Sequence, residues 1–529
     1  MVNIGINKSR DKIKRILFIQ LPLLDHGKNY ISSNYLYAPA ILTEFINRNR
    51  NDVFSADWLD PYIVNNLSDE RIADYIIEYN PDIIGFTVFL WNAERALSIA
   101  ELVKKRKSIK VIFGGPEIYK ESFLFYTKRN YVDLFCSGEG EWFFDRFPKE
   151  DNLSLIQNNK VMFQPQDELV GIDKIYHTSI KNISRLSSGN TFFIEMTRGC
   201  PFRCCYCNYS KNSKKIRLKP IDIIEKEIHN SNSEPIYLLA PSINSRPDFN
   251  DLLDMLIRIN NVNTIHAEVN AATITEETAQ KMFKAGFISV EAGLQTISDE
   301  ARKRIKRLDS VESEIKGIAN LQKAGISVKA GMIPGLPGDT IKDFKNGIDF
   351  TLAKGISESI EIYPLMILPG TELVELYNEK GINRQKYPPY YLIEKDEFNI
   401  DTIKKIIKYK DDKAGIVSMR RHMPDMSSSG KGYTKGFSID LTKSINLNNM
   451  LSQYVETSVC TIVIKTDNSE QIYRSINDVI YDKTHPNILV NLVIESNTLM
   501  SDGTIKRLLT AEERDTVYGR MGVFDDDEN

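Results

Sequence analysis

The sequence predicts an α/β protein built from an N-terminal doubly wound (Rossmann-like) sheet, a partial (β/α)6 barrel of the TIM type and a small C-terminal α/β region. Apolar runs alternate with helical patterns over most of the 529 residues, as in parallel sheets with intervening helices. Weak periodicity and turn residues at 151–190 indicate a connector. We therefore divide the chain into 1–150, the connector, a barrel at 191–390 and a last region at 391–529.

The N-terminal part has the pattern of a parallel sheet. Continuous apolar runs that end at turn residues predict buried strands at 15–22, 82–90, 110–117 and 131–141. Apolar residues at helical spacing predict helices at 39–48 and 92–106. Ligands bind beyond the carboxyl ends of the strands in such sheets, where VFLWN (88–92), GGPE (114–117) and GEGE (138–141) fall.

The barrel part contains six strand signals separated by helices, with a repeat of roughly 25–35 residues that suits a partial β/α barrel. Strands are predicted at 191–197, 235–242, 264–272, 288–295, 327–338 and 359–370. Helices are predicted at 219–231, 249–259, 275–286, 312–325 and 340–355. Catalytic residues of such barrels follow the strands, so the segment after the first strand is the first place to look.

The C-terminal part has a different sequence pattern from the barrel part. A serine- and glycine-rich stretch at 427–432 indicates a linker. Strands at 460–466 and 488–496 with a helix at 469–481 predict a small accessory unit. We expect the region 391–529 to cover the open side of the barrel or to bind the substrate, and the acidic end to fray.

Composition excludes several classes of partner. The formal net charge is −3, so no basic field favours nucleic acid or a membrane surface. No apolar run reaches the length of a membrane span, and residues 1–14 lack the apolar region of a signal peptide. We expect a cytoplasmic protein without nucleic-acid or membrane partners, and the oligomeric state stays open.

Cysteine is concentrated in one place, the stretch RGCPFRCCYC (198–207), which holds four of the six cysteines. Cys200, Cys204 and Cys207 have the spacing C-x3-C-x2-C, and three thiolates can hold three irons of a [4Fe–4S] cube while the fourth iron stays open. Zinc is the alternative, but it prefers a fourth ligand, and His229 lies outside any compact pattern. The spacing therefore favours an iron–sulfur cluster.

The other cysteines have simpler interpretations. Cys205 cannot replace Cys204 without shifting the spacing, so we expect its side chain to point away from the cluster. Cys136 and Cys460 are expected to be ordinary buried cysteines. With one cysteine on each side of the loop region, a single cluster is predicted.

The cysteine loop and the segments after it resemble the radical S-adenosylmethionine (radical SAM) enzymes. The resemblance rests on IEMTRGCPFRCCYC (194–207), VEAGLQT (290–296), GLPGDT (335–340) and ILPGTELVELY (367–377), which occur in family order. It implies that the open iron chelates the amino and carboxylate groups of S-adenosylmethionine. Reduction by a donor such as flavodoxin or ferredoxin then releases methionine and a 5′-deoxyadenosyl radical.

The resemblance also suggests which residues hold S-adenosylmethionine. Glu268, Glu291 and Gln295 lie in strands whose ends face the predicted site, where they can bind the ribose or the amino group; the resemblance favours Gln295. Arg304 or Arg307 can pair with the cofactor carboxylate, although a solvated helix face is the alternative for both.

Two further features of the predicted cofactor site come from the same comparison. Tyr206, the aromatic residue before the last cysteine, is expected beside the cofactor. Family members often carry a glycine-rich segment with an acid after the second strand, but here LLAPSIN (238–244) occupies that place. Recognition of the amino group then falls to backbone carbonyls and to Ser242 or Asn244.

A doubly wound sheet before such a barrel resembles the cobalamin-binding subclass of this family. The segments that carry the resemblance are 34–46, 81–94, 111–119 and 132–144. It implies that cobalamin lies against the loops after the strands, at Gly114, Gly115, Pro116, Gly138 and Glu139. Glycines without a Cβ permit close approach to a flat macrocycle, although such turns also end strands in any doubly wound sheet.

The lower face of the cobalt is expected to carry no histidine. Asp25-His26-Gly27 has the letters of the usual cobalamin motif without its spacing, which makes His26 a poor axial ligand. In the subclass that face is open or covered by the loop after the third strand, where Leu90, Trp91 and Asn92 lie.

The resemblance implies a cobalamin-dependent radical SAM enzyme that methylates an unactivated carbon of a small-molecule or peptide natural-product precursor. Ring rearrangement or cyclisation, and radical chemistry without cobalamin on the same scaffold, remain open alternatives. An alternative of another class is a non-catalytic protein that binds a corrinoid or a cluster, against which the intact cysteine loop argues.

Overall fold

The computed structural model describes residues 13–22, 34–123, 126, 130–147, 160–165, 168–176, 191–209, 215–231, 235–260, 264–356, 360–378, 383–415, 436–440, 459–465, 489–495 and 521–523. The chain divides into two compact units. The first comprises Met1–Leu21, Leu36–Ile175 and Ile180–Leu186, and the second comprises Pro22–Tyr35, Tyr176–Ser179 and Ser187–Asn529. His26 lies outside the described residues.

The first unit is a six-stranded, entirely parallel sheet with the order β2-β1-β3-β4-β5-β6. Its strands are β1 (Lys14–Ile19), β2 (Phe54–Trp58), β3 (Ile83–Thr87), β4 (Lys110–Gly114), β5 (Leu134–Ser137) and β6 (Lys160–Phe163). The order reverses between β1 and β3, and in doubly wound sheets the ligand crevice lies at such a switch point. The predicted fold class is confirmed.

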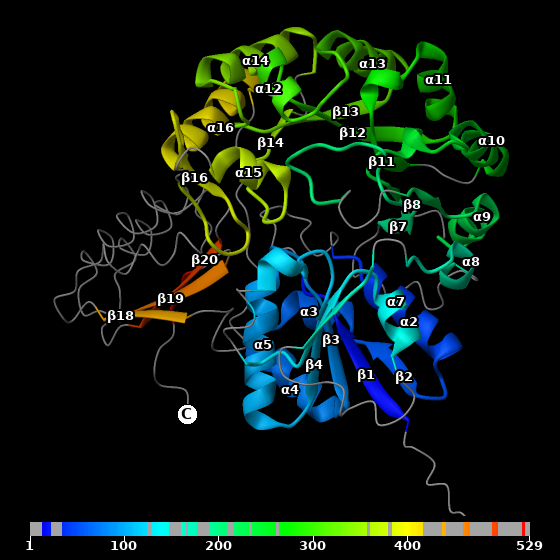
Figure 1. Ribbon diagram of the computed structural model, residues 1–529. Coiled ribbons are helices and arrows are strands. Elements are labelled where there is room, and N and C mark those ends of the chain that lie inside the picture. The colour runs from blue at the N-terminus through cyan, green and yellow to red at the C-terminus, as the bar shows by residue number, and fades with distance from the viewer. Residues whose placement is uncertain are drawn as a thin grey trace, which may run out of the picture. The chain divides into compact units, whose positions relative to one another are not determined.

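Helices cover both faces of this sheet. They are α2 (Tyr37–Asn49), α3 (Pro61–Asn66), α4 (Asp69–Tyr79), α5 (Ala93–Arg106), α7 (Gly140–Arg146) and α8 (Ile172–Ile175), with a short 3-10 turn, η1 (Lys120–Ser122). α4 and α5 pack together on one side of the strands and α2 and α7 on the other (Figure 1). The strands β1 and β3 between these layers are almost wholly buried, as their unbroken apolar runs predict.

Two strands of the sheet were not predicted from the sequence. β2 reads FSADW, in which exposed and half-buried polar residues alternate with apolar ones because it is an edge strand. β6 lies within 151–190, so the interpretation of that whole segment as a connector is wrong. Its four residues pair with β5 at the other edge of the sheet and are only partly covered, which explains their weak apolar signal.

The second unit contains the six parallel strands of an open barrel, in the order β14-β13-β12-β11-β10-β7. The strands are β7 (Phe192–Glu195), β10 (Ile236–Leu239), β11 (Ile265–Val269), β12 (Phe287–Gln295), β13 (Ser327–Met332) and β14 (Ile360–Ile362). Sequence order equals spatial order, as expected when parallel strands are joined by helical connections, so the predicted partial (β/α)6 barrel is confirmed.

Helices follow these strands along the outer side of the curved sheet (Figure 1). They are α9 (Ile221–His229), α10 (Phe249–Ile259), α11 (Glu276–Lys284), α12 (Asp299–Arg304), α13 (Val311–Lys323) and α14 (Ile341–Ala353), with 3-10 turns η3 (Ile243–Ser245) and η4 (Ala271–Thr273). Side chains alternate along the strands: on β11, Ile265, Ala267 and Val269 are buried, whereas His266 and Glu268 are half-buried. One face of the sheet is therefore apolar core and the other is a partly open, polar surface.

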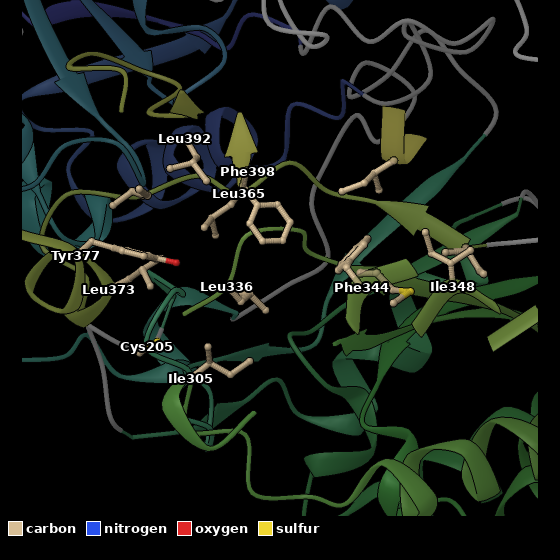
Figure 2. Packing of buried hydrophobic residues seen from close by; sticks show 14 residues of the cluster. Cys205, Ile305, Leu336, Phe344, Ile348, Leu365, Leu373, Tyr377, Leu392 and Phe398 are labelled. Carbon is tan, nitrogen blue, oxygen red and sulfur yellow. The ribbon is translucent and has the colours of Figure 1, made fainter. Parts of the chain in front are cut away.

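The chain after the barrel strands packs on the same unit. It forms α15 (Glu372–Asn378), a three-stranded antiparallel sheet of β15 (Asn383–Arg384), β16 (Leu392–Lys395) and β17 (Phe398–Asn399), and α16 (Ile400–Ala414). Leu392 and Phe398 share one buried apolar cluster with Leu336 and Leu373 (Figure 2). Part of the region predicted as accessory is thus continuous with the barrel core.

The last described elements form a four-stranded parallel sheet of β18 (Gly436–Asp440), β19 (Val459–Lys465), β20 (Leu489–Glu495) and β21 (Met521–Val523). The strands predicted at 460–466 and 488–496 are confirmed as β19 and β20. The predicted helix at 469–481, the linker at 427–432 and the acidic end lie outside the described residues. Among the helices that the structure describes, none has the length and apolar character needed to cross a membrane.

Candidate functional site

The cysteine loop begins directly after the first barrel strand and is closed at its base by a short antiparallel pair, β8 (Thr197–Arg198) with β9 (Arg217–Leu218). Gly199 starts the loop with a φ of +96°, and a Cβ there would lie 2.5 Å from the carbonyl oxygen of Lys215. Only glycine fits this crossing of two backbones. The loop is therefore fixed at the carboxyl end of β7, where catalytic residues of such barrels lie.

Cys200, Cys204 and Cys207 are half-buried cysteines in this loop. Burial, together with the neighbouring Cys207 and Cys204, raises the pKa of Cys200, while the backbone N–H of Phe202 opposes the shift. The backbone N–H of Cys207 bonds to the carbonyl of Cys204 at 3.1 Å, which curls the loop. Cys204 and Cys207 therefore both oppose ionisation of Cys200, a cost that bound iron would remove.

This donor set fits a [4Fe–4S] cube. Among the described residues, no three metal-binding side chains already converge on a single ion. A cube does not need such convergence, because each thiolate binds a different iron. The backbone N–H of Tyr209 lies 3.4 Å from the Cys207 sulfur, and N–H groups directed at sulfur are a usual feature of iron–sulfur sites.

Cys205 faces the opposite way, as expected. Its side chain is 2% exposed and packs in the apolar cluster beside Ile305 and Leu373 (Figure 2). Its backbone N–H bonds to the Ile305 carbonyl at 3.2 Å, and its carbonyl accepts from Leu373 at 3.1 Å. Burial raises the pKa of Cys205 to about 12, so it stays a neutral thiol that anchors the loop. Cys136 is likewise buried, as expected.

Tyr206 and Arg307 lie next to the cysteines. Burial, followed by the nearby charge of Cys204, raises the pKa of Tyr206, while the charge of Arg307 opposes the rise. Arg307 lies close enough to both residues for the charge of its guanidinium to act on them. Its Nε donates to Glu314 Oε1 at 2.8 Å and its Nη2 to the carbonyl of Gly293. Of the two candidate arginines, Arg307 is therefore the one beside the cysteine loop.

Arg304 has the surroundings of a solvated helix face. Its Nε pairs with Glu300 at 2.6 Å one helical turn away, and both side chains are about half exposed. Surface pairs of this type contribute little to stability. Its described contacts do not include the cysteine loop.

Gln295 ends β12 in an unusual conformation. Its φ is +64°, and the Thr296 N–H bonds back to the Leu294 carbonyl at 2.8 Å, which is the three-residue bond of a γ-turn with positive central φ. Its buried side-chain Oε1 has no hydrogen-bond partner among the described residues. A strained backbone and an unsatisfied acceptor at a strand end are typical of a ligand-binding position.

Glu268 and Glu291 face each other on the polar side of the sheet, because the parallel register pairs them directly. Glu268 accepts from the Tyr237 hydroxyl at 3.2 Å and Glu291 from the Tyr363 hydroxyl at 2.6 Å. Burial, followed by the charge of Glu291, raises the pKa of Glu268 to about 7. The pair can therefore hold a proton, and Glu268 is near enough to influence Cys200.

Ser242 and Asn244 are already bound within the protein. Asn244 accepts from the Asn270 N–H at 2.9 Å and donates to the Asn270 carbonyl at 2.9 Å. Ser242 donates to Asn244 at 3.1 Å and accepts from Ser245 at 2.8 Å. These bonds join the loops after β10 and β11, so both residues shape the site through the loops that carry them.

In the first unit, the structure explains why glycine is required at one position of the pair at the end of β4. Gly115 has a φ of +106°, and a Cβ there would lie 2.7 Å from the Val88 carbonyl oxygen. At Gly114 a Cβ would meet only Cys136 at 3.6 Å, which is ordinary contact. Gly115 is thus required by the neighbouring loop of the protein itself. Pro116 follows on the exposed surface.

The loop after β5 is held by Gln164. Gly138 has a φ of +124°, and a Cβ there would lie 2.4 Å from Gln164 Oε1. The same oxygen accepts from the Glu139 N–H at 2.7 Å. The sequence did not single out Gln164, because it follows the unpredicted strand β6.

Asn92 braces the loop after β3. It is fully buried, accepts from the Phe89 N–H at 2.8 Å, and donates to the carbonyls of Leu21 at 3.1 Å and Thr87 at 3.2 Å. The loop that it fixes holds Phe89 and Trp91 in a parallel stack with ring centroids 4.4 Å apart. Together with Leu90 these rings are partly exposed beyond a strand at the switch point, which fits the flat face of a corrin.

Two residues of the barrel site were missed altogether. Arg302 and Glu314 are almost fully buried and form a two-point ion pair at 2.9 and 3.1 Å. In the sequence alone, the charges around Arg304 and Arg307 indicate cofactor ligands or a solvated helix face. A usable signal was present in α13, where Glu314 shares the buried face with Ile318 and Leu321 at spacings of four and seven residues.

Comparison with known protein families agrees with this architecture. Residues 194–351 match the radical SAM superfamily, and residues 50–147 match the B12 binding domain. The first match covers the end of β7, the cysteine loop and the four barrel strands β10 to β13, and the second covers β2 to β5.

Individual relatives are distant. The chain is 22% identical to the cobalamin-dependent radical SAM methyltransferase TokK of Streptomyces tokunonensis, over 60% of this chain and 52% of that protein. It is 24% identical to the bacteriochlorophyllide d C-8(2)-methyltransferase of Chlorobaculum tepidum, over 63% of this chain and 77% of that protein. The chain spans about half the length of the first of these relatives.

Solved structures share the fold. The methyltransferase TsrM from Kitasatospora setae, with cobalamin and a [4Fe–4S] cluster bound, aligns with a TM-score of 0.59 at 14% identity, over 79% of this chain and 92% of TsrM. The cobalamin-dependent S-adenosylmethionine radical enzyme OxsB aligns with a TM-score of 0.51 at 14% identity, over 77% of this chain and 62% of OxsB.

Proposed function

We propose that this chain, a radical SAM protein with a cobalamin-binding domain, transfers a methyl group to an unactivated carbon of a small-molecule or peptide substrate. The observation that carries the proposal is the presence in one chain of the three-cysteine loop after the first barrel strand and of a matching B12-binding sheet. The naming of two relatives as methyltransferases supports methyl transfer over ring rearrangement.

The residues divide by cofactor. Cys200, Cys204 and Cys207 would each hold one iron of the cluster. Gln295 and Arg307 would hold S-adenosylmethionine, and the stack of Phe89 and Trp91 would lie against cobalamin. When bound, the cluster and S-adenosylmethionine supply a 5′-deoxyadenosyl radical and cobalamin supplies the methyl group.

The chain's own groups prepare this chemistry. Gln295 Oε1 is a buried acceptor ready for a hydroxyl or ammonium donor, and its strained turn fixes the direction in which it points. Arg307 offers a guanidinium to a carboxylate. Burial, followed by the charge of Glu291, raises the pKa of Glu268 to about 7, so Glu268 can take up a proton near neutral pH.

Atoms and charges balance in the proposed overall reaction, and no product stays bound to a metal. Two S-adenosylmethionine molecules and two electrons convert a substrate C–H group into C–CH3. The other products are 5′-deoxyadenosine, methionine and S-adenosylhomocysteine. We propose a one-electron donor such as flavodoxin or ferredoxin as the source of the electrons.

The decisive test is product analysis with the protein loaded anaerobically with iron, sulfide and hydroxocobalamin. After reduction by dithionite in the presence of S-adenosylmethionine, 5′-deoxyadenosine and S-adenosylhomocysteine should both form, and a corrinoid spectrum should co-elute with the protein. The Cys204→Ala variant should bind the corrinoid but form no 5′-deoxyadenosine.

Other outcomes would contradict the proposal and indicate a different function. S-adenosylhomocysteine without 5′-deoxyadenosine would indicate methyl transfer by a non-radical route. Deoxyadenosine from a protein that binds no corrinoid would leave radical chemistry without cobalamin. Neither product, from a protein with a full cluster, would make the chain a binding protein.

A further inference from the structure

Arg302 occupies an unusual position, because its buried guanidinium donates to three backbone carbonyls around the end of β12. Nη1 donates to the Leu294 carbonyl at 3.1 Å and to the Thr296 carbonyl at 3.2 Å, and Nη2 donates to the Asp309 carbonyl at 2.5 Å. The first two carbonyls flank Gln295 on either side. Arg302 therefore clamps the strained γ-turn in which Gln295 is the central residue.

Glu314 completes the clamp from the neighbouring helix α13. Its two oxygens accept from Arg302 at 2.9 and 3.1 Å, and Oε1 also accepts from Arg307 Nε at 2.8 Å. One carboxylate, 1% exposed, thus orients two guanidinium groups. A two-point pair with a planar guanidinium fixes direction as well as distance.

The two ends of this network meet at Gly293. Arg307 Nη2 donates to its carbonyl, and the Gln295 amide lies over its Cα, where a Cβ would come within 2.3 Å of Nε2 and 3.9 Å of Arg307 Nη1. The unsatisfied Gln295 acceptor and the Arg307 guanidinium are therefore held side by side, next to Tyr206 and Cys204.

We propose that Arg302 and Glu314 are positioning residues for S-adenosylmethionine, which set the Gln295 amide and the Arg307 guanidinium in the arrangement that the cofactor meets. The proposal rests on the function proposed above and extends it to two residues that do not themselves touch the cofactor. A residue in a strained backbone keeps its conformation only when the surroundings over-determine it, and Arg302 supplies that constraint.

The test compares variants of the cluster-loaded full chain by the dissociation constant for S-adenosylmethionine, measured by equilibrium dialysis with the cluster oxidised. Arg302→Lys loses the fork that reaches both carbonyls, and Glu314→Gln loses the shared acceptor. Each should keep the iron and sulfide content of the wild type. Each should weaken binding about 10- to 100-fold, the usual cost of losing a residue that orients a ligand.

Matched controls separate positioning from stability. Glu312→Gln changes an exposed carboxylate on the same helix and should bind as the wild type does. Leu321→Ala removes a fully buried side chain from that helix without touching the clamp. It should lower the melting temperature and leave the dissociation constant unchanged. The electron paramagnetic resonance spectrum of the reduced cluster, with and without S-adenosylmethionine, gives a second readout that should follow the binding data.

A double-mutant cycle shows whether the clamp acts through Gln295. Arg302→Lys should add less than a twofold loss when Gln295 is already Ala, because the clamped side chain is gone. If Glu314→Gln does not fold, the double-mutant cycle with Arg302→Lys still tests the proposal. Wild-type affinity in Arg302→Lys, or full additivity in the cycle, overturns the inference. A wild-type protein with a full cluster that binds no S-adenosylmethionine overturns the proposed function instead.

Discussion

The side-chain amide of Gln295 lies directly over Gly293, so that a Cβ at residue 293 would stand 2.3 Å from Gln295 Nε2. The two residues are two apart on β12 and belong to the same face of the strand. The positive φ of Gln295 turns its side chain back along the strand, and the space that glycine leaves open receives it.

Gly293→Ala should therefore displace the Gln295 amide while leaving the cluster in place. We expect about a tenfold loss of affinity for S-adenosylmethionine, equivalent to about one hydrogen bond. Equilibrium dialysis on the cluster-loaded protein measures it. Ser289→Ala, on the same strand and face, serves as the control. Unchanged binding in Gly293→Ala would separate this amide from the cofactor.

Substitution of single cysteines should distinguish the three predicted cluster ligands from Cys205. Cys205→Ala removes a sulfur from the apolar core and should keep full iron and sulfide content with a small loss of stability, on the order of 1 kcal/mol. Cys200→Ala, Cys204→Ala and Cys207→Ala should each lose the cluster and its visible absorbance. Loss of iron in Cys205→Ala as well would show that the assignment within the loop is wrong.

The glycine pair of the first unit gives a matched comparison. Gly115→Ala meets both a left-handed backbone and the Val88 carbonyl, so it should lower the free energy of unfolding by about 2 kcal/mol or more. Gly114→Ala has room and should cost less than about 1 kcal/mol. Denaturant unfolding without added cobalamin measures both. Equal effects would contradict the packing argument for Gly115.

Asp339, in the loop after β13, should make stability depend on pH. Burial raises its pKa to about 7, and neither carboxylate oxygen has a hydrogen-bond partner among the described residues. The charge of Asp343 adds to the rise and that of Lys395 opposes it. The folded state therefore binds this proton more tightly than the unfolded chain, whose carboxyl has an ordinary pKa of about 3.9. Its contribution to stability is full at low pH and decreases as the pH rises to about 7.

Asp339→Asn should flatten this slope, because the amide does not ionise. The difference in unfolding free energy between wild type and variant should grow in favour of the variant from about pH 4 to pH 7, by at most about 4 kcal/mol. Parallel unfolding curves across that range measure it. A constant difference would mean that Asp339 is ionised throughout.

Local features of the sequence were sufficient to predict the cysteine loop and most of the buried strands. The three-cysteine spacing lies within one loop, and the apolar runs of β1, β3 and the barrel strands record burial that each strand reports on its own. The resemblance of VEAGLQT (290–296) to the radical SAM enzymes pointed to Gln295 as a site residue, and this role stays a prediction. The strand predictions succeeded because the information is contained in a few consecutive residues. The partly covered edge strands β2 and β6 lacked such a signal.

The partners of individual side chains depended on the tertiary structure. Arg302, Arg304 and Arg307 are chemically alike in one short stretch, yet they end in a buried clamp, a surface ion pair and a position beside the cysteines. Asn92 and Ser242 became braces because carbonyls and amides from distant loops reach them.

The buried strands, most helices between them and the three-thiol loop could be predicted from the sequence, since burial periodicity and ligand spacing are properties of the chain. The pairing of charges follows from the tertiary structure, as does the lack of a donor to Gln295 Oε1 among the described residues. The physical reason is that a hydrogen bond or an ion pair is fixed by positions within a few ångströms. Those positions arise when residues far apart in the chain, such as Leu294 and Glu314, fold against one arginine.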